Sequence, residues 1–188
     1  TFSRYFEPEN ARAATDVLEA AGYQVEFALP ADAGRPLCCG RTFLAAGLVE
    51  EAKVEARRVL QALKPYVERG IAVVGLEPSC LLTLRDEYLA MGLGDEAERL
   101  ARHALLFEEF IVAQADAGAL RLDLVPLAAK AALLHGHCHQ KAFDAMPVVR
   151  RVLEMVPGLK VEMVESSCCG MAGSFGYETE HYEVSMKM

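Results

Sequence analysis

The feature that most constrains this chain is a repeated segment that ends, each time, in the motif Cys-Cys-Gly. The two motifs are Cys38-Cys39-Gly40 and Cys168-Cys169-Gly170. When the segments before them are aligned with one residue of slack, Gly22 meets Gly158. A repeat of this kind predicts two half-repeats with the same order of elements, related by a pseudo-twofold axis. The other matched stretches are residues 4–6 with 141–143, 17–19 with 152–154, and 25–26 with 161–162.

Helix-like and strand-like segments alternate along the sequence. The spacing of apolar residues predicts helices over residues 9–21, 44–68, 81–115 and 148–155, with breaks near Pro65 and near Gly92 and Gly94. Asp95 is expected to cap the helix that follows the second break. Short apolar runs predict strands over residues 24–28, 71–76, 131–134 and 160–165. Because strands separated by helices pair in parallel, we expect an α/β fold with layered, Rossmann-like parallel sheets.

The repeat also predicts how the chain is divided. We expect a first half-repeat over residues 1–85, a helical connection over residues 86–129 and a truncated second half-repeat over residues 130–188. The alignment places Thr1 opposite Cys138, so the first copy has lost its opening cysteine. The counterpart of Cys80 in the second copy falls beyond residue 188, and we therefore expect the chain to be part of a longer protein.

The placement of the six cysteines predicts metal or redox chemistry. Adjacent cysteines do not easily bond each other, and no signal peptide suggests an oxidising compartment. Cys80 and Cys138 directly follow predicted strands, and both cysteine pairs lie on loops after strands. Because the carboxyl ends of parallel strands form the ligand-binding crevice of such folds, we expect all six thiols to face one crevice.

Glycine and histidine residues near the cysteines would shape such a site. The loop of residues 170–176, beginning at Gly170, could offer backbone N–H groups to sulfide, although a plain helix-start loop would have the same composition. His135, His137 and His139 flank Cys138, and in an extended segment their alternate spacing places all three imidazoles opposite the thiol. These histidines would either bind zinc or donate hydrogen bonds to cluster sulfur. Thiolates suit both zinc and iron–sulfur clusters, but the Cys-x-x-Cys knuckles typical of zinc sites are missing from the sequence.

Charge and composition exclude several classes of function. The chain of 188 residues has 19 Lys and Arg against 27 Asp and Glu, and a net charge of −8 argues against binding to nucleic acid. No apolar run approaches the roughly 20 residues of a membrane-spanning helix. The glycine-rich dinucleotide and phosphate loops and the serine nucleophile motif are also missing. We therefore predict no catalytic residue in this chain.

Taken together, these motifs resemble a known family. The residues that carry the resemblance are the two Cys-Cys-Gly motifs and residues 76–80, 135–139 and 168–176. They resemble the cysteine-rich CCG domain of the heterodisulfide reductase B subunit, of glycolate oxidase iron–sulfur subunits, and of the C-terminal region of FAD-linked D-lactate and related 2-hydroxy-acid dehydrogenases. The residues of these motifs are most similar to those of the last group. Thr1 and Thr83 stand where related domains have cysteines, so we expect one cluster rather than two.

The resemblance implies that the chain is part of an oxidoreductase and relays electrons. FAD, in a flavin-containing dehydrogenase domain or subunit outside this chain, would take a hydride from a 2-hydroxy acid. Electrons would then pass singly through an iron–sulfur cluster, of the [4Fe–4S] type, towards a quinone or a redox protein. The parent protein would be cytoplasmic or peripheral at the inner face of the membrane. The implied cluster ligands are Cys38, Cys39, Cys80, Cys138, Cys168 and Cys169, with Gly170 beside them and His137 and His139 as secondary candidates.

Two other classes of function remain open at this point. One is a thiol–disulfide enzyme of the heterodisulfide reductase type, and the other is a zinc-stabilised interaction module. Among the thiols, we rank those of the second copy above those of the first, because the second copy keeps its opening cysteine. In the alternative arrangement, Cys39 and Cys80 cross over to complete the second copy's site. The predicted order places Cys138, Cys168 and Cys169 above Cys38, Cys39 and Cys80.

Overall fold

The computed structural model describes residues 2–31, 34–166, 169–171 and 175–188. The chain separates into two compact units, one ending at Val125 and the other beginning at Pro126. Thr1 and Cys168 lie outside the described residues, and so does part of the glycine-rich loop after Gly170. The three segments inferred from the repeat stay a prediction.

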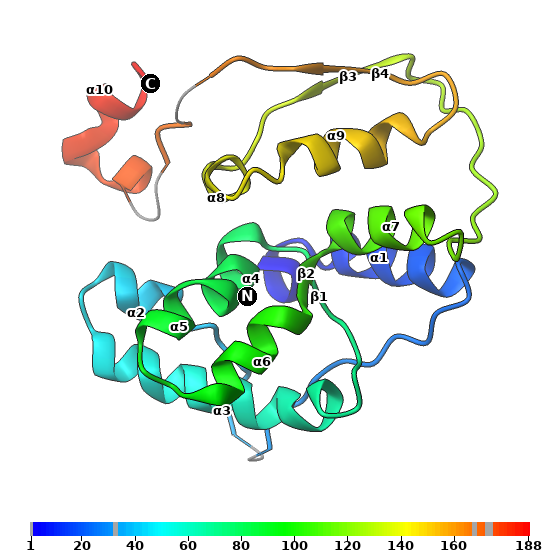
Figure 1. The fold of residues 1–188 in the computed structure, drawn as a ribbon. Helices are drawn as coiled ribbons and strands as arrows, with labels where there is room; N and C mark the ends of the chain where they lie inside the picture. Colours follow the sequence, from blue (N-terminus) through cyan, green and yellow to red (C-terminus); the bar gives the residue numbers. More distant parts are fainter. Residues whose placement is uncertain (1, 32–33, 167–168, 172–174) are drawn as a thin grey trace. The chain divides into compact units, whose positions relative to one another are not determined.

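The first unit is mainly helical and contains one small parallel sheet (Figure 1). Strands β1 (Val73–Gly75) and β2 (Ala104–Leu106) pair in parallel, with Val74 opposite Leu105. The chain crosses between them through helices, as parallel pairing requires. The helices of this unit are η1 (Phe2–Phe6), α1 (Pro8–Ala20), α2 (Arg41–Ala45), α3 (Val49–Val67), α4 (Pro78–Arg85), α5 (Glu87–Ala90), α6 (Asp95–His103) and α7 (Phe107–Asp116).

Helix α3 provides much of the core of the first unit. Ala52, Ala56 and Val59 recur at helical spacing and are buried, so one face of the helix packs inward. Helix α6 packs against α3, and helix α4 packs against both α6 and β2. Leu82 and Leu100 are almost fully buried in this packing. The core therefore includes α4, which contains Cys80, and α3, which follows the first cysteine pair after the short helix α2.

The second unit places a helix beside a second parallel sheet. Strands β3 (Ala131–Leu134) and β4 (Lys160–Met163) pair with Leu133 opposite Glu162. Helix α9 (Met146–Glu154) runs alongside this sheet and packs against β4 (Figure 1). Met146 and Val149 of α9 and Val161 of β4 are buried. The other elements of the unit are α8 (Cys138–Ala142), η2 (Phe175–Tyr177), η3 (Thr179–His181) and α10 (Tyr182–Ser185).

The predicted alternation of helices with parallel strands is confirmed in both units. Each sheet has two strands, and the prediction that the half-repeats are Rossmann-like and related by a pseudo-twofold axis stays a prediction. Among the described residues, no helix is long and apolar enough to cross a membrane.

Several predicted elements were wrong in detail. The strand predicted over residues 24–28 does not form; Phe27 and Leu29 are instead exposed in irregular backbone. The predicted helix of residues 44–68 is two helices, separated at Gly47, where φ is +75°. Pro65 does not break α3, because it lies in the last turn and removes only one helical hydrogen bond.

Two further corrections concern residues 81–115. Strand β2 interrupts this predicted helical region. The strand was not predicted because its three apolar residues also fit the spacing of a helix. Asp95 is the first residue of α6 and not its cap; the cap position belongs to Gly94, and no side chain caps the helix.

Candidate redox and metal centre

Three thiols gather in the first unit, although two of them are far from the third in sequence. The Sγ atoms of Cys39 and Cys80 lie 3.1 Å apart across 41 residues of chain. Cys38 is hydrogen-bonded to Cys39 through the thiols. All three side chains are half-buried. The fold therefore joins the first cysteine pair to the cysteine that follows β1. The strand-end argument accounts only for Cys80 among these three residues, since the strand expected before Cys38 does not form.

The loop that carries the first pair is held by packing from both sides. At Gly40, φ is +83°, and a β-carbon there would lie 2.9 Å from the carbonyl oxygen of Ala52 in α3. Only glycine combines this conformation with such a close approach. The hydroxyl of the fully buried Tyr88 donates a hydrogen bond of 3.0 Å to the carbonyl of Cys39. Tyr88 in α5 and Ala52 in α3 thus fix the backbone of the cysteine pair.

Cys80 reaches the same place because α4 begins directly after β1. Pro78 occupies the first turn of α4, where its missing N–H costs nothing, and Cys80 follows two residues later. The positive end of a helix dipole favours a thiolate in this first turn. Thr83, one turn further, is fully buried, and its hydroxyl donates to the carbonyl of Ser79 at 2.8 Å.

The pKa values of the three thiols are shifted in different directions. Donation from Cys39 lowers the pKa of Cys80 below its ordinary value. Cys38 lowers the pKa of Cys39, but the bond to Cys80 and burial outweigh this effect and raise that pKa to about 11. The bond to Cys39, together with burial, raises the pKa of Cys38 well above its usual range. Cys80 is therefore the thiol that most readily carries negative charge.

The donor set fits a soft metal centre. Three half-buried sulfurs are ligands that iron–sulfur clusters and zinc prefer. Two sulfurs bound to one tetrahedral zinc at about 2.3 Å would lie about 3.8 Å apart, so Cys39 and Cys80 would have to separate slightly. Within the described part of the chain, no three Cys, His, Asp or Glu side chains are arranged as a site for a single ion. The three thiols instead form a hydrogen-bonded row.

In the second unit, Cys138 and Cys169 are both exposed. Cys138 begins α8 just after β3, and Cys169 follows β4. Cys168, predicted as a ligand beside them, lies outside the described residues. Whether all six thiols face one crevice stays a prediction.

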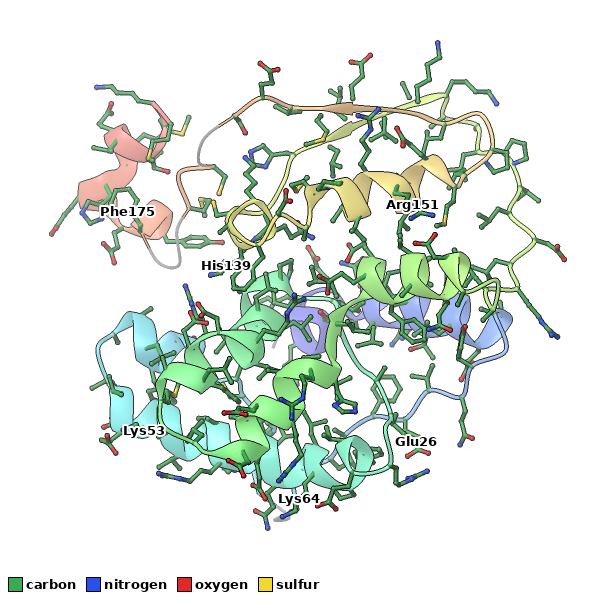
Figure 2. All side chains as sticks on the ribbon, viewed as in Figure 1. Glu26, Lys53, Lys64, His139, Arg151 and Phe175 are labelled. Carbon is green, nitrogen blue, oxygen red and sulfur yellow. The ribbon has the colours of Figure 1, made fainter. Side chains whose placement is uncertain are left out.

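The extended segment that was expected to hold all three imidazoles does not reach His139, so their placement on one side stays a prediction. The extended segment ends at His137, and His139 already belongs to α8 (Figure 2). The backbone N–H of His139 donates to Nδ1 of His137 at 3.1 Å, and the two rings stack with centroids 5.2 Å apart. A neutral imidazole whose Nδ1 accepts a hydrogen bond carries its proton on Nε2. His137 in this arrangement offers a donor, which suits a sulfide neighbour better than a metal ion.

Gly170 has the same structural need for glycine as Gly40. At Gly170, φ is +74°, and a β-carbon would lie 2.5 Å from the carbonyl oxygen of Ser185 in α10. The hydroxyl of Ser185 donates back to the carbonyl of Gly170 at 2.7 Å. Each Cys-Cys-Gly glycine is thus pressed against the backbone of a later helix of its own unit.

Sequence reasoning missed four residues around the first thiols. No sequence pattern indicates the role of Tyr88, because a tyrosine at a core position of a helix is common. The other three are Arg35, Glu55 and Arg58, an ion-pair group that joins the loop before Cys38 to α3. A carboxylate at position 55, on the same helical face as Ala52 and Val59, is the sequence signal that could have revealed this group.

The chain belongs to the cysteine-rich domain family named CCG, whose model matches residues 1–85 and 132–188. It is 29% identical to the C subunit of anaerobic glycerol-3-phosphate dehydrogenase of Escherichia coli K12, over 98% of this chain and 45% of that protein. It is 31% identical to D-2-hydroxyglutarate dehydrogenase of Pseudomonas putida, over 98% of this chain and 17% of that protein. It is 24% identical to lactate utilization protein A 2 of Bacillus cereus, over 98% of this chain and 74% of that protein.

The chain therefore spans less than half of the first two relatives and about three quarters of the third. No solved structure matches it. The predicted resemblance to the CCG domain of hydroxy-acid dehydrogenases is confirmed at the level of the family.

Proposed function

We propose that this chain is the iron–sulfur-binding, electron-transfer region of a FAD-linked 2-hydroxy-acid dehydrogenase. The observation that carries the proposal is the meeting of Cys39 and Cys80 in a family defined by its cysteines. The three relatives are named for different compounds, namely glycerol 3-phosphate, D-2-hydroxyglutarate and lactate. Electron transfer is the task that such proteins can share. The choice of a 2-hydroxy acid follows the second and third relatives.

The cysteines would hold the cluster, and the surrounding residues would set its environment. The proposed ligands are drawn from Cys38, Cys39, Cys80, Cys138, Cys168 and Cys169. A [4Fe–4S] cluster supplies the ability to accept and release one electron at a time. The first turn of α4 favours the negative charge of the Cys80 thiolate, and Nε2–H of His137 would donate to sulfur.

The partners would lie outside this chain. A flavin-containing domain or subunit would supply electrons, and a quinone or redox protein would receive them. We place the protein in the cytoplasm or at the inner face of the membrane. Within this chain no residue is assigned to the oxidation of substrate.

Iron counting on the full-length protein tests the proposal. The protein is purified without oxygen, reconstituted with ferrous iron and sulfide, and assayed for iron, sulfide and absorbance near 400 nm. We expect brown protein with bound iron and sulfide, and an electron paramagnetic resonance signal after reduction with dithionite. Colourless protein with stoichiometric zinc would instead support the interaction module.

Single Cys→Ser variants test which thiols matter. We expect Cys138→Ser, Cys168→Ser and Cys169→Ser to lose more iron than Cys38→Ser, Cys39→Ser and Cys80→Ser. His103→Ala is the control, because His103 is half-buried and bonds only its own helix at Arg99 in the described contacts. Full iron in Cys138→Ser, with loss in Cys38→Ser, would reverse the ranking.

One observation favours a second candidate function, a thiol–disulfide exchange. Cys39 and Cys80 are close enough to react with each other after small movements. A Cys39–Cys80 disulfide would form as the substrate disulfide breaks, and the two electrons and two protons of the thiols would leave with the substrate as two thiols. Reduction of a disulfide by iron-free protein, abolished in Cys39→Ser and Cys80→Ser, would support this function over the relay.

A further inference from the structure

Helix α3 contains a charged side chain on its core face. Glu55 is only 1% exposed and lies among Ala52, Ala56 and Val59, which are buried core residues. Burying a carboxylate costs several kcal/mol unless it is paired and fully hydrogen-bonded. Glu55 must therefore have partners that compensate for the water it has lost.

Two arginines satisfy this carboxylate. The guanidinium of Arg35 meets both carboxylate oxygens, with Nη1 2.7 Å from Oε2, in a two-pronged ion pair. Nη1 of Arg58 donates to the same Oε2 at 3.0 Å. Arg58 also donates to the carbonyls of Arg35 at 2.6 Å and Pro36 at 3.4 Å. Residues 35 and 36 are thus tied to α3 through both side chain and backbone.

The tied segment leads directly into the first cysteine pair. Arg35 precedes Cys38 by three residues, and on the other side Gly40 lies against Ala52 of the same helix. Both ends of the cysteine loop are therefore anchored on one stretch of α3, between Ala52 and Arg58. Only residues 37–39 lie between the two anchors.

Stability alone explains this group poorly. Replacing a buried ion pair by apolar residues of similar volume is often neutral or stabilising. A two-pronged arginine–carboxylate pair does, however, fix one relative orientation of the segments that it joins.

We propose that Glu55 is a positioning residue for the Cys38-Cys39 loop. Through Arg35 and Arg58 it holds the loop in the conformation in which Cys39 meets Cys80. The effect on the thiols is independent of any bound group, whereas the effect on a cluster rests on the function proposed above. The experiment therefore has one arm for each.

The first arm measures thiol reactivity in the metal-free, full-length protein. The protein is reduced, freed of metal without oxygen, and pulsed with N-ethylmaleimide, and mass spectrometry gives the rate at each cysteine. We expect Glu55→Gln to raise the labelling rate of Cys39 about tenfold or more, because the charged hydrogen bonds that close the loop are lost. Glu55→Asp keeps the charge but shortens the reach, and we expect a similar rise.

Matched controls separate positioning from general loosening. Glu109 also pairs with an arginine in this unit, since Nη1 of Arg85 lies 2.8 and 2.7 Å from its two carboxylate oxygens. Glu109→Gln should leave the Cys39 rate unchanged, and Cys138 and Cys169 should label at the wild-type rate in every variant. Should Glu55→Gln fail to fold, Arg35→Lys replaces it, since Arg35 is 58% exposed and lysine cannot form the two-pronged contact. Wild-type rates in the Glu55 variants, or an equal rise in Glu109→Gln, would overturn the proposal.

The second arm uses protein reconstituted with iron and sulfide. We expect iron to be lost to a chelator about 10- to 100-fold faster from Glu55→Gln than from wild type. The reduction potential should move in the positive direction, because a negative charge near the cluster is removed. If wild type holds no iron, the proposed function fails while the labelling arm still decides on Glu55. If wild type holds iron and the variant matches it in both readouts, the role of Glu55 towards the cluster fails.

Discussion

At the scale of single residues, the two Cys-Cys-Gly motifs show why glycine ends each of them. Gly40 and Gly170 both have positive φ, and both lie where a β-carbon would collide with a backbone carbonyl. The close approach is to the chain's own backbone, at Ala52 and Ser185. Glycine is therefore required by the packing of the loop itself, before any ligand is considered.

This requirement can be measured by alanine substitution. We expect Gly40→Ala to lower the free energy of unfolding by clearly more than the roughly 1–2 kcal/mol that positive φ alone costs a non-glycine residue. Gly47 is the matched control, since its φ is +75° and a β-carbon at that position would meet nothing within 4 Å. Urea unfolding of both variants gives the difference. Equal losses at the two positions would mean that the contact with Ala52 is unimportant.

At the scale of helices and strands, periodicity located most elements but not their ends. The strand after Lys130 and the helices around α1 and α9 were predicted within a few residues, because the spacing of apolar residues in the sequence marks each of them. Strand β2 was not, because three apolar residues between helices fit either period. The strand predicted over residues 24–28 failed because propensity alone does not supply a neighbouring strand.

The start of α6 gives a prediction at this scale. Asp95 is the first helical residue, so it acts on the helix dipole and not as a cap. We expect Asp95→Asn to cost about 0.3–1 kcal/mol of unfolding free energy, and Asp95→Ala to cost no more than that. Thermal unfolding at low and high salt checks both values. Asparagine is as good a cap as aspartate, so wild-type stability in Asp95→Asn with a larger loss in Asp95→Ala would restore the capping role.

At the scale of the whole molecule, the sequence indicated which thiols would lie near each other, but not which residues hold them in place. Cys39 and Cys80 were expected to share a site, and their Sγ atoms lie 3.1 Å apart, although the strand expected before Cys38 does not form. The ion-pair group at Glu55 depends on a loop crossing α3, which no local pattern in the sequence reveals. Long-range contacts of this kind are set by tertiary packing, so the ion pairs that join the cysteine loop to α3 were not predicted.

The buried carboxylate should make the stability of the protein depend on pH. Hydrogen bonds from Arg35, and then from Arg58, hold the pKa of Glu55 below its ordinary value of 4.5. Besides these arginines, the Cys38 thiol interacts electrostatically with this carboxylate. A group with a lowered pKa contributes its stability above its ordinary pKa and loses it as pH falls through the folded-state value.

We therefore expect the difference in unfolding free energy between wild type and Glu55→Gln to be constant above about pH 6. It should shrink as the pH falls below the ordinary value of 4.5. Urea unfolding at a series of pH values from about 7 to about 3 measures this difference. A difference that stays constant throughout this range, or that grows on acidification, would contradict the assignment.

The separation of Cys39 and Cys80 in the sequence also dictates an order of events. Closing a loop of 41 residues costs about 3 kcal/mol of chain entropy, so the two thiols do not meet in an unfolded chain without help. In the folded chain, the packing of α3 and α4 against β1 brings the two thiols together. A metal centre bridging them would therefore bind a chain whose fold already holds the two thiols together.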